Sequence, residues 1–275
     1  MDKQAFYTSL RRRNSGVFGT SLSQKQVEGM EAIIDDGAHL PLSHLAYALA
    51  TTYGETGGRM QPISENMNYT SARRIEQVFS NSRRKGIPGG QMVRNPEKLA
   101  NTVYGGILGN GTDNGDGWRF RGRGFVQNTG RLNYEKVRAL TGVDVVSEPD
   151  LALRIDVAAK ALIAGIEHGI YTGKKASDYL PGDYRNARRI INGTFEADKY
   201  AGYARAFDAA LTEAGYRAAQ QVVPTSPPAM PEIYPEPAST RPTQPVEDAS
   251  RASTPEKPAT GLLASLLRLF GSLKG

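Results

Sequence analysis

Two glutamates ten positions apart, Glu55 and Glu65, are the residues of this chain whose chemistry is easiest to name. They lie within the stretch YGETGGRMQPISE, where glycine and proline interrupt a preceding helical pattern. A pair of carboxyl groups with different proton affinities can cleave a glycosidic bond, one as general acid and the other as general base. The intervening residues allow almost any separation of the two groups, so the spacing alone also permits a plain surface acid at position 55.

The expected surroundings of the two glutamates differ. Apolar residues recur at helical spacing from Leu42 to Tyr53, and the glycines that follow predict that the helix ends beside Glu55. The negative C-terminal end of a helix disfavours an ionised carboxylate, so we expect Glu55 to have a raised pKa and to act as the acid. Glu65 follows polar residues, with Arg59 and Arg73 near in sequence. We therefore expect Glu65 to stay ionised and to act as the base.

The elements that position these residues are predicted to be mainly helices. Helical patterns cover residues 21–36, which begin with a serine cap, and then NPEKLANTVYG, EPDLALRIDVAAKALIAGIEHG, GDYRNARRIINGT and about residues 198–214. Between them, GDGWRFRGRGFVQNTG is rich in glycine and alternates aromatic residues with arginine, which favours a short hairpin or twisted loop. The predicted fold class is α+β, mostly α, with a small β element.

Composition divides the chain into three parts. Ten of the sixteen prolines lie between Pro224 and Pro258, where large apolar residues are few, so we predict a disordered linker over residues 223–260. The formal charge of +6 divides into −2 on this linker, +2 on residues 261–275 and +6 on residues 1–222. Residues 1–222 are therefore a basic folded domain, which favours a polyanionic partner such as a cell wall, a lipid surface or nucleic acid.

The last fifteen residues, GLLASLLRLFGSLKG, predict a short amphipathic helix over residues 261–275. Leucine and phenylalanine side chains fall on one broad arc, with Ser265, Arg268 and Ser272 opposite. The segment is too short to span a bilayer, but it can lie at an anionic membrane or lipopolysaccharide surface. Docking onto the domain itself and self-association are the alternatives.

Several other kinds of site find no support in the sequence. Cysteine is absent, GGILGNGTDNGDG has no Walker lysine, and DNGDG lacks the order of calcium ligands in an EF-hand. The three histidines are too scattered to suggest a metal site, so no metal or organic cofactor is expected. The start MDKQAFYTSLRRRNSG has no apolar leader and no run is long enough to span a membrane, so we expect a soluble chain made in the cytosol.

Three motifs together point to a known family. ATTYGETGGRMQPISENMNY, GDGWRFRGRGFVQNTGRLNY and ARRIINGTF occur in this order between about Leu45 and Arg205. The pattern resembles glycoside hydrolase family 19, the chitinase-like lysozymes, and is most similar to the compact members among phage endolysins. The resemblance implies a lysozyme-like helical domain over residues 1–222 that cleaves β-1,4 glycosidic bonds with inversion.

The resemblance also implies roles for individual residues. Glu55 is expected to be the general acid and Glu65 the general base. The residues expected to hold the sugar and the attacking water are Gln127, Thr129, Asn133, Asn192 and Arg205. One departure from the family pattern is Gly54, because members commonly have histidine immediately before the acid. The substrate loops of the larger chitinases are also absent, which favours bacterial peptidoglycan over crystalline chitin.

The sequence therefore predicts a monomeric peptidoglycan hydrolase of the endolysin type, which degrades the cell wall and causes lysis. We expect it to reside in the host cytoplasm, to reach the wall through a membrane lesion and not to bind nucleic acid. Two alternatives stay open: a chitinase that acts on chitin oligomers, and a glycan-binding module without catalytic activity.

Overall fold

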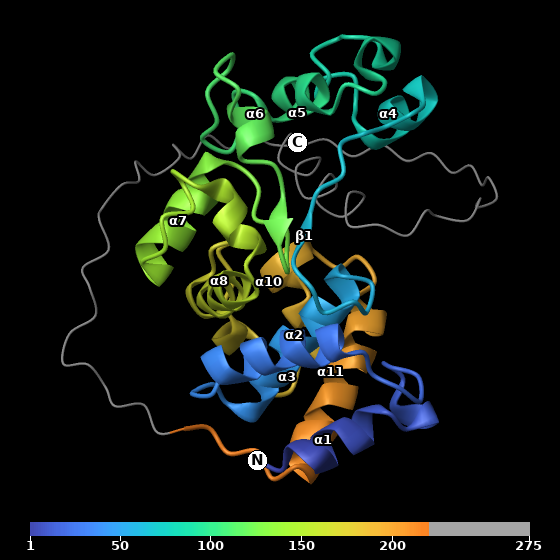
Figure 1. Cartoon of the computed structure of the whole chain (residues 1–275), viewed down its shortest axis with the longest axis vertical. Helices are drawn as coiled ribbons and strands as arrows, with labels where there is room; N and C mark the ends of the chain where they lie inside the picture. The colour runs from blue at the N-terminus through green and yellow to red at the C-terminus, as the bar shows by residue number, and fades with distance from the viewer. Residues whose placement is uncertain (220–275) are drawn as a thin grey trace, which may run out of the picture. The chain divides into compact units, whose positions relative to one another are not determined.

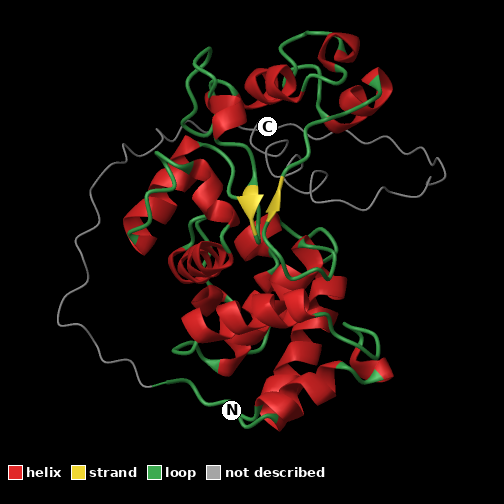
Figure 2. Cartoon of the chain, viewed as in Figure 1, coloured by secondary structure: helices red, strands yellow, loops and turns green. Residues whose placement is uncertain are grey.

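The computed structural model describes residues 1–219, and this part of the chain is mostly helical with one two-stranded sheet (Figure 2). The expected fold class, mostly α with a small β element, is confirmed. The predicted linker at 223–260 and the predicted amphipathic helix at 261–275 lie outside the described residues. The domain boundary at residue 222 stays a prediction.

The α-helices are α1 (Lys3–Leu10), α2 (Gln24–Asp36), α3 (Leu42–Glu55), α4 (Ala72–Val78), α5 (Pro96–Tyr104), α6 (Asp116–Arg119), α7 (Arg131–Thr141), α8 (Ile155–His168), α9 (Tyr184–Ala187), α10 (Arg189–Asn192) and α11 (Ala197–Glu213). Short 3-10 helices are η1 (Arg13–Ser15), η2 (Gly89–Met92), η3 (Pro149–Leu153) and η4 (Ala176–Asp178). The strands are β1 (Ile63–Ser64) and β2 (Arg123–Gly124), which pair antiparallel with Ile63 opposite Gly124.

Capping residues explain why several helices begin where the sequence predicts. The Ser23 side chain accepts from the backbone of Gln26 in a capping box at the start of α2, and Asn95 accepts from Lys98 at the start of α5. The helical run after Pro41 forms α3 and ends at Glu55, as expected. The end expected at Asn192 is also confirmed, since α10 ends there and Gly193 has a positive φ of 48°.

Three expected elements differ in the structure. The helix predicted over GDYRNARRIINGT is divided at Arg188 into α9 and α10. The single helix predicted over EPDLALRIDVAAKALIAGIEHG is broken at Arg154, whose extended backbone separates η3 from α8. The segment predicted as a short hairpin or twisted loop places Trp118 in α6 and contributes β2, which pairs with the distant β1. A single bridge between Arg123 and Asn128 is all that remains of the predicted hairpin. The alternation of aromatic residues with arginine at residues 118–121 lies in α6 and just after it, whereas β2 begins at Arg123.

The main apolar core surrounds α3. Nine of its residues are buried, from Leu45 to Glu55, and α11 packs along it, while α2 packs against both α3 and α8. A second cluster joins α4, α5 and η2, and a third joins α7, α8 and η3. Figure 1 shows α3 and α11 side by side, with α4 and α5 together beyond the two strands. Because neighbouring helices pack around α3, its C-terminal end and Glu55 are held in place.

Within residues 1–219, the structure contains no helix with the length and apolar character needed to cross a membrane.

Candidate active site

Glu55 is the last residue of α3, and its side chain is 3% exposed. Its Oε1 lies 2.7 Å from a terminal guanidinium nitrogen of Arg188 and accepts a 2.9 Å hydrogen bond from the Tyr200 hydroxyl. The sequence predicted an acid left at the negative end of a helix. The structure shows in addition a buried cation, Arg188, beside the carboxylate.

Arg188 and Tyr200 hold each other as well as Glu55. The Arg188 guanidinium lies 3.7 Å from the centroid of the Tyr200 ring, and its Nε donates to the carbonyl of Phe195. Burial alone would lower the pKa of Arg188, but the charge of Glu55 outweighs it and raises that pKa. The guanidinium therefore stays charged although it is only 1% exposed.

Sequence reasoning missed Arg188 and Tyr200, the two residues that hold Glu55. Arg188 precedes the predicted site residue Asn192 by one helical turn, and Asn192 donates its backbone N–H to the carbonyl of Arg188. That i, i+4 spacing was a usable signal. Tyr200 is 145 positions from Glu55 and carried no local signal of its role.

Glu65 directly follows β1, and the residue is 7% exposed. Its Oε1 accepts a 2.7 Å hydrogen bond from the Tyr104 hydroxyl, and its Oε2 accepts from the backbone N–H of Gly122 at 3.2 Å. Its own N–H donates to the Gly122 carbonyl at 2.8 Å. Three hydrogen bonds thus fix both the backbone and the carboxylate of Glu65.

The surroundings of Glu65 correct one prediction. We expected polar, arginine-rich surroundings and an ionised side chain, but burial raises the pKa of Glu65, although the hydrogen bonds from Tyr104 and Gly122 and the charge of Arg121 oppose the shift. The expected neighbours Arg59 and Arg73 are both exposed. Proximity in sequence was misleading because β1 carries Glu65 away from both arginines and into the interior.

The loop between the two glutamates is held rigidly. The Thr56 hydroxyl accepts from the N–H of Met60, and the N–H of Gly58 donates to the Tyr53 carbonyl. The loop also rests on α2 at Gly29, where an added Cβ would lie 1.8 Å from the carbonyl oxygen of Met60. Gly57, Gly58 and Met60 all have positive φ, which only glycine adopts without strain. The relative placement of Glu55 and Glu65 is therefore built into this loop.

Three predicted substrate residues lie on the segment that contacts Glu65. Gln127 donates its side-chain amide to the carbonyl of Ile63, two residues before Glu65, and the Thr129 hydroxyl donates to the carbonyl of Gln127. Asn133 donates to the carbonyl of Thr129. These hydrogen bonds fix the loop backbone, so the side chains have a structural function whatever their role toward a sugar.

Gly122, between Arg121 and Arg123, links this loop to Glu65. A Cβ at Gly122 would lie 2.5 Å from Oε1 of Gln127 and 3.1 Å from the Thr129 hydroxyl oxygen. The same glycine bonds the carboxylate of Glu65. Gln127 and Thr129 are thus brought next to Glu65, which agrees with a role around that carboxylate.

The other two predicted substrate residues lie elsewhere. Asn192 is buried at the end of α10, on the helical segment that also supplies Arg188 to Glu55. Arg205 is exposed on α11 and lines a cavity of about 410 Å³ together with Asp183, Tyr184, Arg185 and Asp208. The arginine that contacts Glu55 in the structure is Arg188, and a substrate role for Arg205 stays a prediction.

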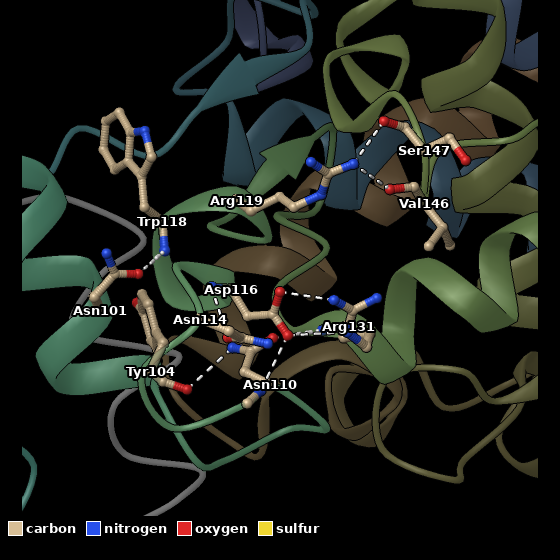
Figure 3. Close-up of polar contacts among 11 residues, drawn as sticks. Asn101, Tyr104, Asn110, Asn114, Asp116, Trp118, Arg119, Arg131, Val146 and Ser147 are labelled. Carbon is tan, nitrogen blue, oxygen red and sulfur yellow. Dashed lines mark hydrogen bonds and ion pairs between the residues drawn. The ribbon is translucent and has the colours of Figure 1, made fainter.

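A polar network around Asp116 and Asn110 leads to Tyr104 (Figure 3), and the Tyr104 hydroxyl donates to Glu65. Asp116 accepts two hydrogen bonds from Arg131, at 2.7 and 2.9 Å, and one from the N–H of Gly111. Asn110 accepts from the N–H of Arg131 and donates to the carbonyl of Tyr104, whose hydroxyl holds Glu65. In the DNGDG turn, Asp113 and Asn114 are exposed, whereas the buried Asp116 joins α6 to α7 through its ion pair with Arg131.

The arginines of the WRFRGR segment have separate partners. Arg123 is 3% exposed and pairs with Asp150, and Arg119 donates to the carbonyls of Val146 and Ser147 (Figure 3). The Arg121 guanidinium stacks 3.8 Å from the ring centroid of Trp118. Trp118 is half-buried against the second core cluster. Of these three arginines, Arg121 is the one whose charge lowers the pKa of Glu65.

Within residues 1–219, no three histidine, aspartate or glutamate side chains gather as a group that could hold a metal ion.

Comparison with known proteins supports the resemblance seen in the motifs. No protein-family model matches the chain. Over 119 residues the chain is 37% identical to a glycosyl hydrolase family 19 domain-containing protein of Haemophilus influenzae. The match covers 43% of this chain and 58% of that protein. The chain thus spans somewhat more than half the length of its curated relative.

Solved structures give a weaker likeness. A bacterial family 19 chitinase is 18% identical with a TM-score of 0.39, over 80% of this chain and 97% of that one. Chitinase C from Streptomyces griseus is 14% identical with a TM-score of 0.34, over 80% of this chain and 78% of that one. TM-scores this low do not support an argument about the family, so the comparison depends on the sequence match alone. On that match, the resemblance to glycoside hydrolase family 19 is confirmed.

Proposed function

We propose that this chain is a glycoside hydrolase that cleaves β-1,4 bonds of bacterial peptidoglycan with inversion. The observation that carries the proposal is a pair of buried carboxylates, Glu55 at the end of α3 and Glu65 after β1, each held by a tyrosine hydroxyl. Two carboxyl groups in distinct surroundings are what glycosidic hydrolysis requires. The sequence match to a family 19 domain supports the same reaction.

In the proposed reaction, one carboxyl group donates a proton to the leaving oxygen and the other removes a proton from the attacking water. Glu55, protonated, gives its proton to the leaving oxygen as the glycosidic bond breaks. Glu65 takes a proton from the water whose oxygen attacks the anomeric carbon. The raised pKa of Glu65 makes it a stronger proton acceptor than an ordinary carboxylate. The hydrogen bonds from Tyr104 and Gly122 fix the direction from which Glu65 can take that proton.

The electrostatics of the free protein also favour a reversed assignment. Glu55 forms an ion pair, whereas the surroundings of Glu65 raise its pKa, and a raised pKa suits an acid. Leaving-group dependence separates the two assignments. Loss of the acid matters little for a substrate whose leaving group needs no proton, such as a nitrophenyl glycoside, whereas loss of the base matters for every substrate.

The first experiment tests whether the chain is an enzyme and on which polymer it acts. We expect the wild-type chain to clear a permeabilised Gram-negative suspension faster than it hydrolyses soluble chitin. Glu55→Gln should abolish clearing by several orders of magnitude while leaving the circular dichroism spectrum unchanged. Faster hydrolysis of chitin oligomers would identify a chitinase, and retained binding to cell wall without any hydrolysis would identify a glycan-binding module.

The second experiment assigns the roles. Glu55→Gln and Glu65→Gln are compared on a nitrophenyl chitooligosaccharide and on the unmodified oligosaccharide. With Glu55 as acid, the loss in Glu55→Gln is much smaller on the nitrophenyl substrate, and the loss in Glu65→Gln is the same on both. The opposite pattern would establish Glu65 as the acid.

The preference for peptidoglycan is supported by charge. Residues 1–222 carry a net +6, and bacterial wall polymers are anionic. Mass spectrometry of digested wall tests this preference, because the sugar at the new reducing end identifies the bond that is cut. Products with no new reducing end would exclude glycosidic cleavage of the wall.

For the tail, we propose that residues 261–275 bind an anionic membrane or lipopolysaccharide after the protein leaves the host cytoplasm through a membrane lesion. The support is the amphipathic sequence with Arg268 and Lys274. Deletion of residues 261–275 should weaken binding to vesicles that contain anionic lipid and leave activity on purified wall intact. Vesicle binding equal to that of the full chain would contradict the proposal.

A further inference from the structure

The residue before Glu55 is a glycine, and the space beside it is filled by an aromatic ring. A Cβ at Gly54 would lie 2.4 Å from Cε1 of Tyr200 and 2.8 Å from its hydroxyl oxygen. Real Cβ atoms do not approach other atoms so closely, so any larger residue at position 54 would displace this ring. Tyr200 can therefore lie against the end of α3 only because residue 54 is a glycine.

The position of the Tyr200 ring places its hydroxyl against one oxygen of the Glu55 carboxylate. Tyr200 is 6% exposed, and its hydroxyl donates to Oε1 of Glu55 at 2.9 Å. Arg188 contacts the same Oε1 at 2.7 Å, so the hydroxyl and the guanidinium share one oxygen of the carboxylate. Burial, and then the charge of Glu55, raises the pKa of Tyr200, which keeps the hydroxyl protonated and therefore a donor. The two contacts leave Oε2 as the oxygen of Glu55 that can carry a proton toward a substrate.

We propose that Tyr200 is a positioning residue for the hydrolytic reaction. Its hydroxyl occupies Oε1 of Glu55 and so directs the transferable proton to Oε2. This inference rests on the proposed function of Glu55 as general acid. In the step concerned, the bond between Oε2 and its proton breaks, and the proton joins the leaving oxygen. The electron pair of the broken glycosidic bond stays on that oxygen, and Glu55 is left as a carboxylate stabilised by Arg188 and Tyr200.

Tyr200→Phe tests the hydroxyl while keeping the ring. We expect kcat on peptidoglycan to fall roughly tenfold or more with KM little changed, because a hydrogen bond to a charged group is lost from the step and not from sugar binding. We also expect the alkaline limb of the pH profile of kcat/KM to move to higher pH, since the Glu55 carboxylate loses a donor that stabilises it. A purely structural tyrosine would not move that limb.

Tyr203→Phe is the matched control, because Tyr203 lies on the same helix and packs edge-on against the rings of Tyr53 and Tyr200. It should keep the wild-type kcat and pH profile. Gly54→Ala should reproduce the loss in Tyr200→Phe by displacing the ring. Gly202→Ala is its control, because an added Cβ at Gly202 in α11 meets nothing within 4 Å.

The outcomes separate this inference from the proposed function. If Glu55→Gln is inactive but Tyr200→Phe has the kcat and pH profile of the wild type, the positioning role is overturned and the enzyme assignment stands. If Glu55→Gln retains wild-type hydrolysis, or the wild-type chain hydrolyses no glycan, the proposed function falls and the positioning role falls with it. Thermal melting of each variant identifies any loss that comes from unfolding.

Discussion

Replacement of Arg188 by methionine should destabilise the fold strongly, because it leaves the Glu55 carboxylate buried without its cation. The pair is among the most buried in the described residues, with side chains 1% and 3% exposed and atoms 2.7 Å apart. Removing one partner of such a pair costs about 3–5 kcal/mol. Loss of the guanidinium stacked on Tyr200 adds about 0.5–2 kcal/mol. Methionine keeps most of the apolar volume, so little of the loss comes from a cavity.

The measurement is urea unfolding, followed by circular dichroism, of Arg188→Met, Arg185→Met, Glu55→Gln and the double variant Glu55→Gln/Arg188→Met. The exposed pair of Arg185 and Asp198 is the control, with side chains 57% and 82% exposed, so Arg185→Met should cost less than about 1 kcal/mol. In a Glu55→Gln background the cost of Arg188→Met should shrink by about 2 kcal/mol, since no buried charge is then left alone. Equal losses in Arg188→Met and Arg185→Met would refute the description of Glu55 as a buried, paired carboxylate.

Three further predictions concern Glu65 and its support. Burial raises the pKa of Glu65, so the folded state holds this proton more tightly than the unfolded state and loses stability as pH rises above the ordinary value of 4.5. Glu65→Gln should therefore lose less stability than the wild type between pH 4.5 and 8 in thermal melts. Parallel curves of melting temperature against pH would contradict this. Tyr104→Phe removes a hydrogen bond that lowers the pKa of Glu65, so the acid limb of hydrolysis should move to higher pH if Glu65 is the base, and an unmoved limb would exclude that role. Burial would raise the pKa of Asp116, but hydrogen bonds from Arg131, Gly111 and Asn114 lower it overall. The ionised carboxylate therefore contributes stability at pH values above the ordinary pKa of 3.8, and this contribution is lost on acidification. Asp116→Asn should cost about 1–3 kcal/mol at pH 7 and less at pH 3, measured by urea unfolding.

Local signals explain what the sequence predicted well. Ser23 and Asn95 cap their helices through hydrogen bonds that span only three residues, and Gly193 ends α10 with a backbone conformation that favours glycine. Glu55 was placed correctly at the end of α3 for the same reason. Each of these features depends on neighbouring residues, so periodicity and capping chemistry are enough to find it.

Long-range pairing explains what the sequence could not predict. The surroundings of Glu55 depend on Arg188 and Tyr200, which lie more than a hundred positions away, and those of Glu65 depend on Tyr104 and Gly122. The electrostatic argument for Glu55 considered the helix end alone and missed the guanidinium opposite it. The prediction for Glu65 counted arginines near in sequence, whereas burial beside β2 determines the direction of its pKa shift.

The attachment of Glu55 to α10 and α11 has a consequence during synthesis. While the ribosome is still making the segment before Arg188, α3 has no cation or tyrosine to receive its terminal carboxylate, and the other side of α3 lacks α11. A prematurely terminated product would carry both glutamates and yet have no ordered acid. We therefore expect a product that ends before Arg188 to lack the proposed activity, because the partners that hold the Glu55 carboxylate are made last.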